Sequence, residues 1–418
     1  MTSTLVPSTP PLDSSSDWVQ ALRLAPLAGR TALRLLQRLQ RGRLELVTPT
    51  GQELCFGPGP EPGLPAARLV LRRWDAASAA LRSGDIGFAE AYLRGDWSSP
   101  DLPLLLRLML VNRQALATVI HGSWAGRLMY RWRHLLHRNT RSGSRRNIHA
   151  HYDLGNAFYR LWLDETMTYS SACFEGDAGR DLAGAQRAKM ARALRMTGVQ
   201  QGTRVLEIGC GWGALAEMAA GELGAQVTGI TLSSEQLSHG MARLAAAGLS
   251  HRAQLRLQDY RDVNDGPYDA IVSIEMIEAV GRAYWPTYFG TVQRLLRPGG
   301  RACIQAIVIR DELFDDYLRS TDFIQQYIFP GGCLLSPRAI REQAARAGLH
   351  IVDSYAFGPD YAETCRRWRQ AFLAQRDAVR ALGFDERFVR LWSFYLAYCE
   401  AGFDAGDIDV VQVTLRKS

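Results

Sequence analysis

The sequence predicts an α/β protein with a doubly wound, mostly parallel sheet, preceded by a smaller α+β domain. Three observations predict this class. The 418 residues are too many for one hydrophobic core of typical size. From Thr203 onward, short apolar runs alternate with helical patterns, which is typical of a parallel sheet. The first of these runs enters a turn with three glycines, directly before a helical pattern.

The first part of the chain predicts a disordered tail at residues 1–17 and an α+β domain at 18–125. The tail is rich in Ser, Thr and Pro, which cannot form a packed core. A Pro- and Gly-rich loop at 57–63 and a helical pattern at 101–111 follow farther on. Short alternating runs predict antiparallel strands at 43–47, 53–56 and 67–71.

Residues 126–146 predict a basic linker. Arginines and aromatic residues alternate there, which suits a lipid headgroup boundary because guanidinium groups bind phosphates and aromatic rings sit half in water. A solvated connector between domains explains the same composition equally well. The residues concerned are Trp124, just before this stretch, and within it Arg127, Tyr130, Arg131, Trp132, Arg133, Arg138, Arg141, Arg145 and Arg146.

Residues 147–418 predict the larger, catalytic domain. Its strands are expected at 204–208, 226–231, 254–258, 269–274 and 301–309. Helical segments separate most of them, so the strands should be parallel. A late strand at 410–415 is expected to close one edge of the sheet.

The net charge and the cysteine content indicate which partners and which cellular compartment to expect. The formal net charge of +7 favours an anionic partner, either nucleic acid or a membrane surface, although an Arg-rich composition without function gives the same value. The seven cysteines form no CxxC pair, which favours a reducing cytoplasm. No run of 18 uncharged apolar residues occurs, so membrane contact is expected to be peripheral.

The pattern Glu207-x-Gly209-x-Gly211-x-Gly213 predicts a nucleotide-binding turn. Glycines let the chain bend and let a ligand lie against bare backbone near a helix N-terminus. A nicotinamide dinucleotide competes as the ligand, but no acidic residue ends the second strand to bind its ribose. The spacing resembles the first motif of class I S-adenosylmethionine-dependent methyltransferases.

The sequence resembles the cyclopropane-fatty-acyl-phospholipid synthase family, which includes the mycolic acid cyclopropane synthases. A looser match in the first domain is EAYLRGDW at 90–97. The motifs that support the resemblance are HAHYDLGNAFY at 149–159, MTYSS at 167–171, LEIGCGWG at 206–213, GITLSSEQ at 229–236, SIEMIEAVG at 273–281, FPGG at 329–332 and GPDY at 358–361.

The resemblance implies a reaction, a cofactor and a base. The π electrons of an alkene in an unsaturated fatty acyl chain of a phospholipid attack the methyl group of S-adenosylmethionine. A base, implied to be bicarbonate, then removes a proton from the new methyl group and a cyclopropane ring closes. Such a site has to exclude water, which would capture the cation.

The resemblance also implies site residues by their place in the motifs. The cofactor would contact Tyr169, Ser170, Gly209, Gly211, Thr231, Leu232, Gln236 and Tyr260. Bicarbonate would be bound by Ser171, Glu278, Gln305, Ile307 and Tyr361. Of these, Glu278 would orient the ion and is the main predicted catalytic residue, with Tyr361, Ser171 and Gln305 as further catalytic candidates. Cys399 aligns with a late cysteine once proposed as an active-site residue, although its apolar neighbours favour a buried structural thiol.

Two positions depart from the family pattern. Many cyclopropane synthases have cysteine at the position of Ser171 and histidine at that of Gln305. Glutamine keeps a donor but cannot accept a proton as histidine can, so methyl transfer is better supported than ring closure. A methyl-branched or methylene-bearing chain is the alternative product.

Several patterns have more than one interpretation. His149-x-His151-x-Asp153 could suggest a metal cluster, but no further His or Cys group with zinc spacing follows, so no metal is predicted. Glu275, three residues before Glu278, is either a second functional carboxylate or a surface residue. The aromatic residues at 314–329 and 368–398 form either core or an acyl channel.

The expected partners are an anionic phospholipid surface and unsaturated acyl chains, with no nucleic acid, and a homodimer is allowed. The chain is expected in the cytoplasm, peripherally associated with the inner face of the membrane. Two other functions stay open. One is a methyltransferase acting on a small molecule or nucleic acid, and the other is a non-catalytic lipid-binding relative.

Overall fold

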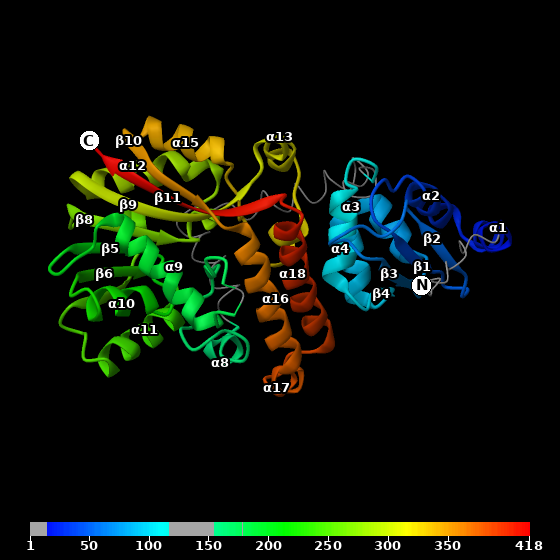
Figure 1. The fold of residues 1–418 in the computed structure, drawn as a ribbon. Helices are drawn as coiled ribbons and strands as arrows, with labels where there is room; N and C mark the ends of the chain where they lie inside the picture. Colours follow the sequence, from blue (N-terminus) through cyan, green and yellow to red (C-terminus); the bar gives the residue numbers. More distant parts are fainter. Residues whose placement is uncertain (1–14, 117–153, 178) are drawn as a thin grey trace, which may run out of the picture. The chain divides into compact units, whose positions relative to one another are not determined.

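The computed structural model describes residues 15–116, 154–177 and 179–418 (Figure 1). Contacts divide the chain into two compact units, Met1–Leu128 and Met129–Ser418. The predicted basic linker and the His149-x-His151-x-Asp153 pattern lie outside the described residues.

The N-terminal unit contains a four-stranded sheet with helices. Its elements are α1 (Ser15–Leu24), α2 (Leu27–Leu36), β1 (Leu44–Val47), β2 (Glu53–Phe56), β3 (Ala67–Leu71), α3 (Asp75–Arg94), β4 (Trp97–Ser98) and α4 (Leu102–Val111). The strand order is β2-β1-β3-β4. Alternate residues of β1 and β3 are buried, which explains why the sequence alternates there.

Two predictions for this unit need correction. The strands were expected to be antiparallel, but β1 pairs with β3 in parallel. The chain leaves β2 through the Pro- and Gly-rich loop and returns on the other side of β1, so β3 runs in the direction of β1. Residues 15–17, expected in the disordered tail, belong to α1, and the next residue, Trp18, packs its ring 6.1 Å from that of Phe56.

The second unit contains a seven-stranded, mostly parallel sheet. Its strands are β5 (Arg204–Ile208), β6 (Gln226–Thr231), β7 (Ala253–Leu257), β8 (Tyr268–Ile274), β9 (Leu296–Ile309), β10 (Leu349–Ala356) and β11 (Ile408–Lys417). They follow the order β10-β11-β9-β8-β5-β6-β7. Strands β5 to β9 are parallel to their neighbours among themselves, whereas β11 is antiparallel to both β9 and β10.

Helices cover both faces of this sheet, which confirms the predicted doubly wound architecture. Leu206 and Ile208 of β5 pack into a core with α12 (Trp285–Leu295) and α15 (Pro337–Arg346). Val205 packs on the opposite face with α9 (Leu182–Thr197) and α10 (Ala214–Gly221). Successive residues of a strand point to opposite faces, so a strand buried on both sides is apolar throughout.

The late strand does not close the edge of the sheet as predicted. β11 lies between β9 and β10, and β10 forms the edge. The sequence of β10 gave little indication of a strand because most of its residues are exposed or half-buried, and Asp353 and Ser354 interrupt its apolar pattern.

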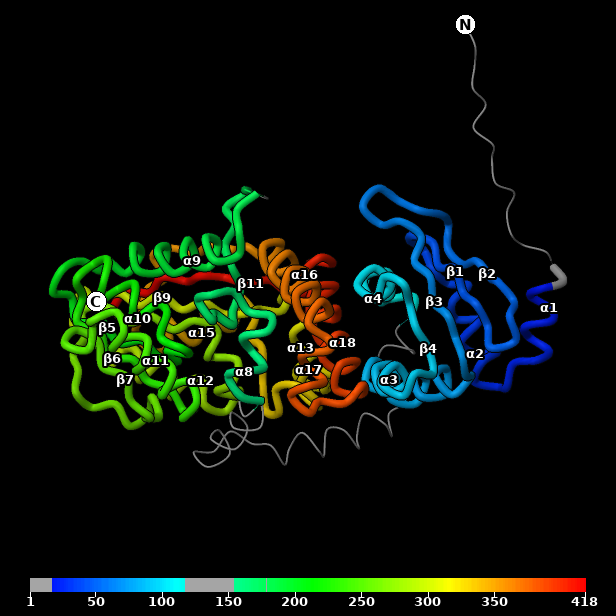
Figure 2. The backbone as a smooth tube through the Cα atoms, turned by 90° about the horizontal axis from the view of Figure 1, so that it is seen from below, coloured from blue at the N-terminus to red at the C-terminus, as the bar shows by residue number. Residues whose placement is uncertain are grey.

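Two long helices, α16 (Gly358–Ala374) and α18 (Glu386–Asp404), lie side by side (Figure 2). Their aromatic side chains pack against one another and against α8 (Asn156–Tyr159). Trp368 and Phe372 are fully buried, and the ring of Phe394 lies 4.9 Å from that of Phe323 in α14 (Phe323–Tyr327). These side chains therefore pack as core.

No helix in the described ranges is both long and apolar enough to cross a membrane.

Candidate active site

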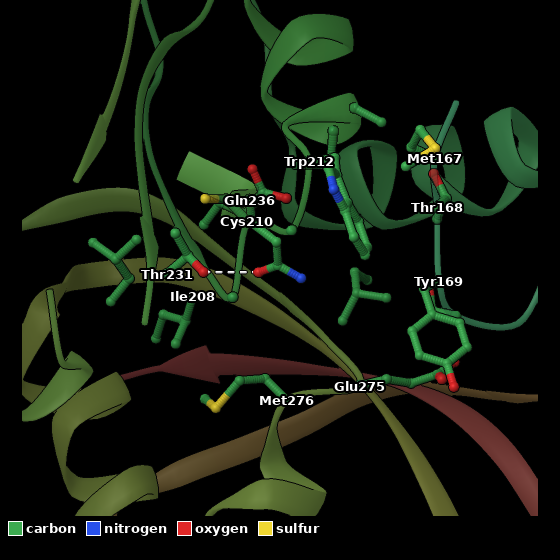
Figure 3. Close-up of a pocket in the computed structure, with 18 of the residues that line it drawn as sticks. Met167, Thr168, Tyr169, Ile208, Cys210, Trp212, Thr231, Gln236, Glu275 and Met276 are labelled. Carbon is green, nitrogen blue, oxygen red and sulfur yellow. Dashed lines mark hydrogen bonds between the residues drawn. The ribbon is translucent and has the colours of Figure 1, made fainter. Parts of the chain in front are cut away.

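The glycine-rich turn between β5 and α10 borders a cavity at the carboxyl ends of the parallel strands (Figure 3). Gly209, Gly211 and Gly213 have φ angles of 87°, 50° and 85°. Glycine adopts this left-handed region at little cost, whereas other residues are strained there. A Cβ atom on Gly211 would meet nothing within 4 Å, so bare backbone faces the open space of the cavity.

The structure brings together all eight residues that the resemblance implied for the cofactor. They come from the segment before α9, the glycine turn, the end of β6, the start of α11 (Ser234–Ala246) and the short helix η1 (Tyr260–Asp262). The residues that line the cavity include Tyr169, Ser170, Gly209, Gly211, Thr231, Leu232, Gln236 and Tyr260. These residues are far apart in the sequence but meet in the structure, because the carboxyl ends of parallel strands all lie at one edge of the sheet.

Hydrogen bonds fix several of these side chains. Thr231 Oγ1 donates to Gln236 Oε1 at 2.8 Å, as Figure 3 shows. The hydroxyl groups of Tyr169 and Tyr395 are 2.6 Å apart, which ties the cavity wall to α18. Tyr260 packs its ring 5.6 Å from that of Tyr288, and burial raises the pKa of Tyr260 to about 12, so it stays neutral.

Glu275 follows β8 and receives hydrogen bonds from three different elements. Oε1 accepts from the backbone N–H of Ser171 at 2.8 Å and from Nε2 of Gln305 at 2.7 Å. Oε2 accepts from the hydroxyl of Tyr361 at 2.6 Å. Glu275 also lines the cavity. The carboxylate therefore lies where three of the residues predicted to bind bicarbonate converge.

Glu275 has a φ of 48°, a conformation that costs a non-glycine residue about 1–3 kcal/mol. Burial raises the pKa of its carboxyl, and Lys189, Tyr361 and the Ser171 and Gln305 donors oppose that rise. The sequence left Glu275 open between a functional and a surface residue; the structure places it in the cavity wall.

Glu278 and Ile307 form a separate pair. The backbone N–H of Ile307 donates to Glu278 Oε1 at 2.5 Å, and Oε2 has no hydrogen-bond partner within the described residues. Burial, followed by repulsion from Glu275, raises the pKa of Glu278 to about 8. Glu278 is therefore mostly protonated at neutral pH and does not contact the Ser171, Gln305 and Tyr361 donors directly.

Lys189 of α9 is fully buried and its Nζ donates to Ser170 Oγ at 2.6 Å. Burial lowers its pKa to about 8, and the nearby Glu275 opposes that fall. Lys189 therefore remains mostly protonated at neutral pH and is a cation in the cavity wall. No motif in the sequence pointed to this residue, although the chain has only two lysines among 49 basic residues.

Cys399 lies on α18, and burial raises the pKa of its thiol. A thiol that keeps its proton is a poor nucleophile, so the geometry agrees with the structural role that its apolar neighbours favoured. Within the described ranges, no group of three or more His, Cys, Asp and Glu side chains is arranged to hold a metal ion.

Comparison with known proteins identifies the family. The model of the mycolic acid cyclopropane synthetase family matches residues 139–413. The tuberculostearic acid methyltransferase UfaA1 of Mycobacterium tuberculosis is 45% identical over 359 residues, which cover 84% of this chain and 83% of that protein. The cyclopropane-fatty-acyl-phospholipid synthase of Escherichia coli is 35% identical over 357 residues, covering 85% and 89%.

A solved structure of the mycolic acid cyclopropane synthase CmaA1, complexed with SAH and CTAB, is similar in fold. Its TM-score is 0.61 with 34% identity, over 65% of this chain and 98% of that one. The chain belongs to the mycolic acid cyclopropane synthetase family and is an S-adenosylmethionine-dependent methyltransferase of the cyclopropane synthase type.

Proposed function

We propose that this member of the family transfers the methyl carbon of S-adenosylmethionine to the double bond of an unsaturated fatty acyl chain in a phospholipid. The observation that best supports this proposal is that the implied cofactor residues and the Glu275 site line the same cavity. All eight implied cofactor residues line it, and the Glu275 carboxylate, bound by three hydrogen-bond donors, lies in the same wall.

The cavity fits a cationic, nucleotide-like ligand. Glu207 and Glu275 both line it, and Glu207 Oε2 has no hydrogen-bond partner among the described residues. S-adenosylmethionine has a sulfonium and an ammonium group, and carboxylates stabilise positive charge in a desolvated site. We propose that the glycine turn and Thr231 hold the nucleoside part, and that Glu207 faces the cationic part.

Bound S-adenosylmethionine supplies an electrophilic methyl group. The alkene π electrons form a bond to that methyl carbon as its bond to sulfur breaks, with the bonding pair staying on sulfur. The acyl chain then bears a cation, which a negative side chain stabilises and which water must not reach. A proton is finally lost from the new methyl group.

Bicarbonate, which the resemblance implies as the base, stays a prediction that this geometry does not favour. The backbone N–H of Ser171, the Gln305 amide and the Tyr361 hydroxyl already donate to Glu275. The N–H of Ile307 donates to Glu278. With these donors engaged, the residues do not fit a separate anion.

Two products are consistent with this chemistry. The cyclopropane is the product that the sequence resemblance implies first. A methylene-bearing chain, which a separate reductant would have to convert to a saturated methyl-branched chain, is supported by the relative of 45% identity, which is named a tuberculostearic acid methyltransferase.

The first prediction concerns the product. Purified enzyme and S-adenosylmethionine, incubated with vesicles of a monounsaturated anionic phospholipid, should yield acyl chains that have gained one CH₂ unit. Mass spectrometry before and after mild hydrogenation separates the outcomes, because a methylene group takes up hydrogen under conditions that leave a cyclopropane intact. Vesicles with saturated chains are the control.

Methylation of a soluble small molecule or nucleic acid instead of the acyl chain would support the first competing function. Cofactor binding without any transfer would support a non-catalytic relative.

We further propose that the enzyme works at the inner, cytoplasmic face of an anionic membrane, attracted by the arginines of residues 126–146. Each basic residue near an anionic bilayer contributes about 1 kcal/mol, and salt screens the attraction. A homodimer also stays a prediction.

The second prediction follows from that attraction. Binding to anionic phospholipid vesicles should weaken as the salt concentration rises, and replacing Arg131, Arg133 and Arg138 by glutamine should reduce it. Sedimentation with vesicles measures both. Replacing the three exposed residues Arg319, Arg376 and Arg380 by glutamine is the charge-matched control. Binding that ignores salt, or that the control reduces equally, would contradict this role.

A further inference from the structure

We propose that the carboxylate of Glu275, a residue of the chain itself, is the base that removes the proton from the new methyl group. The inference rests on the proposed function and names the group that completes it. Glu275 would then take the place that the resemblance assigns to a bound bicarbonate ion, and turnover would not need that ion.

The hydrogen bonds around Glu275 form a site built for a carboxylate. Its donors come from the backbone before α9, from β9 and from α16. Ser171 and Gln305 have no exposed surface, and Tyr361 is buried. Buried donors left without an acceptor are costly, so this set of donors requires an anion or another acceptor. Glu275 meets that requirement without any ligand.

A series of hydrogen-bonded side chains fixes which end of the Gln305 amide faces Glu275. The guanidinium of Arg192, which can only donate, donates to Gln412 Oε1 at 2.9 Å. This turns Nε2 of Gln412 toward Gln305 Oε1, at 3.0 Å. The amide of Gln305 is thereby oriented with its own Nε2 toward Glu275, at 2.7 Å. The series of hydrogen bonds therefore begins at the Arg192 guanidinium, which can only donate, and ends at the Glu275 carboxylate.

The backbone of Glu275 gives independent support. Within the described residues, only Met167, Glu175 and Glu275 have positive φ without being glycine. Glu275 lines the cavity despite this unfavourable conformation. Strain of this kind persists where the surrounding structure imposes it, and it is concentrated at functional sites.

The surrounding charges suit a base. Burial raises the pKa of Glu275, but Lys189 in the cavity wall opposes that rise and favours the ionised form. Glu278, the other carboxyl nearby, has a pKa of about 8 and is mostly protonated at neutral pH. Glu275, unlike Glu278, also lines the cavity.

The step balances without a further reactant. After methyl transfer, a Glu275 carboxylate oxygen forms a bond to one hydrogen of the new methyl group. The electron pair of the broken C–H bond closes the ring on the cationic carbon, or forms a double bond to the methylene carbon after a hydride shift. Glu275 ends protonated and returns the proton to solvent between turnovers.

The test compares wild type, Glu275→Gln and Glu275→Gly in buffer freed of carbon dioxide and in buffer with added bicarbonate. Transfer to unsaturated phospholipid vesicles is measured. Wild type should give the same rate in both buffers. Glu275→Gln should lose about two orders of magnitude or more, the scale of a positioned general base. Glu275→Gly leaves the three donors without their acceptor and removes the strain, so added bicarbonate should restore part of its rate.

Circular dichroism and thermal unfolding show whether each variant is folded, independently of cofactor binding. A wild-type rate that falls when bicarbonate is removed would overturn the inference. So would a Glu275→Gln rate within roughly tenfold of wild type. If wild type modifies no acyl chain, the proposed function is wrong. If wild type modifies acyl chains but depends on bicarbonate, only the inference about Glu275 is wrong, so the two failures can be distinguished.

Discussion

Replacing Gly211 by valine should abolish measurable binding of S-adenosylmethionine. Gly211 has a φ of 50° and its missing Cβ would point into the open cavity. A valine there would occupy space that the ligand needs and would keep the ligand from the bare backbone. The branched side chain would also strain a left-handed position by about 1–2 kcal/mol. Isothermal titration calorimetry measures the loss.

Gly248→Val is the matched control for that variant. Gly248 also has a positive φ, 71°, and a Cβ there would likewise meet nothing within 4 Å. It follows α11 on the surface and does not line the cavity. Both variants share the backbone strain, so only the loss of ligand space separates them. Equal affinities in the two variants would remove the glycine turn from the cofactor site.

Lys189→Met should lower turnover at pH 7 by roughly ten- to a hundredfold and shift the acidic limb of the pH–rate profile upward. Lys189 is protonated below its pKa of about 8 and opposes the rise that burial causes in the pKa of Glu275. Without the cation, the pKa of Glu275 rises further, so a higher pH is needed to ionise it. Methionine has a similar volume, so the substitution removes the charge with little change in packing.

The shape of that profile depends on the other groups around Glu275. The Tyr361 hydroxyl donates to it from α16, and Glu278, whose pKa burial and repulsion from Glu275 raise to about 8, ionises only above neutral pH. Lys417→Met is the control, because Lys417 is the other lysine of the chain. It lies at the end of β11 and donates to the backbone oxygen of Leu296. A Lys189→Met profile that coincides with wild type would show that Lys189 does not tune the base.

Much of the fold could be predicted because its physical signals are local. Strands β5 and β6 are buried on both faces over most of their length, and their bounds agree with prediction. β10 was missed, and β11 was placed at the edge, because strand order depends on pairing between distant segments. The same holds for β1 and β3, whose parallel pairing no local pattern specifies.

The candidate site was predicted unevenly for a similar reason. The glycine turn is a contiguous motif, whereas the site around Glu275 is assembled from residues 171, 275, 305 and 361. The family pattern directed attention to Glu278, and only the structure shows Glu275 among the donors implied for bicarbonate. Lys189 lies in a helix whose pattern gives no sign of function, and its burial follows from tertiary packing.

The most direct test of the account uses S-adenosylmethionine with three deuterium atoms on its transferable methyl group. Enzyme and vesicles of monounsaturated phospholipid are incubated with it, and the acyl chains are analysed by mass spectrometry. We expect a labelled acyl chain that retains two of the three deuterium atoms, because a base removes one from the new methyl group. A product that retains all three, or a label outside the acyl chain, would show that the proposed reaction is wrong.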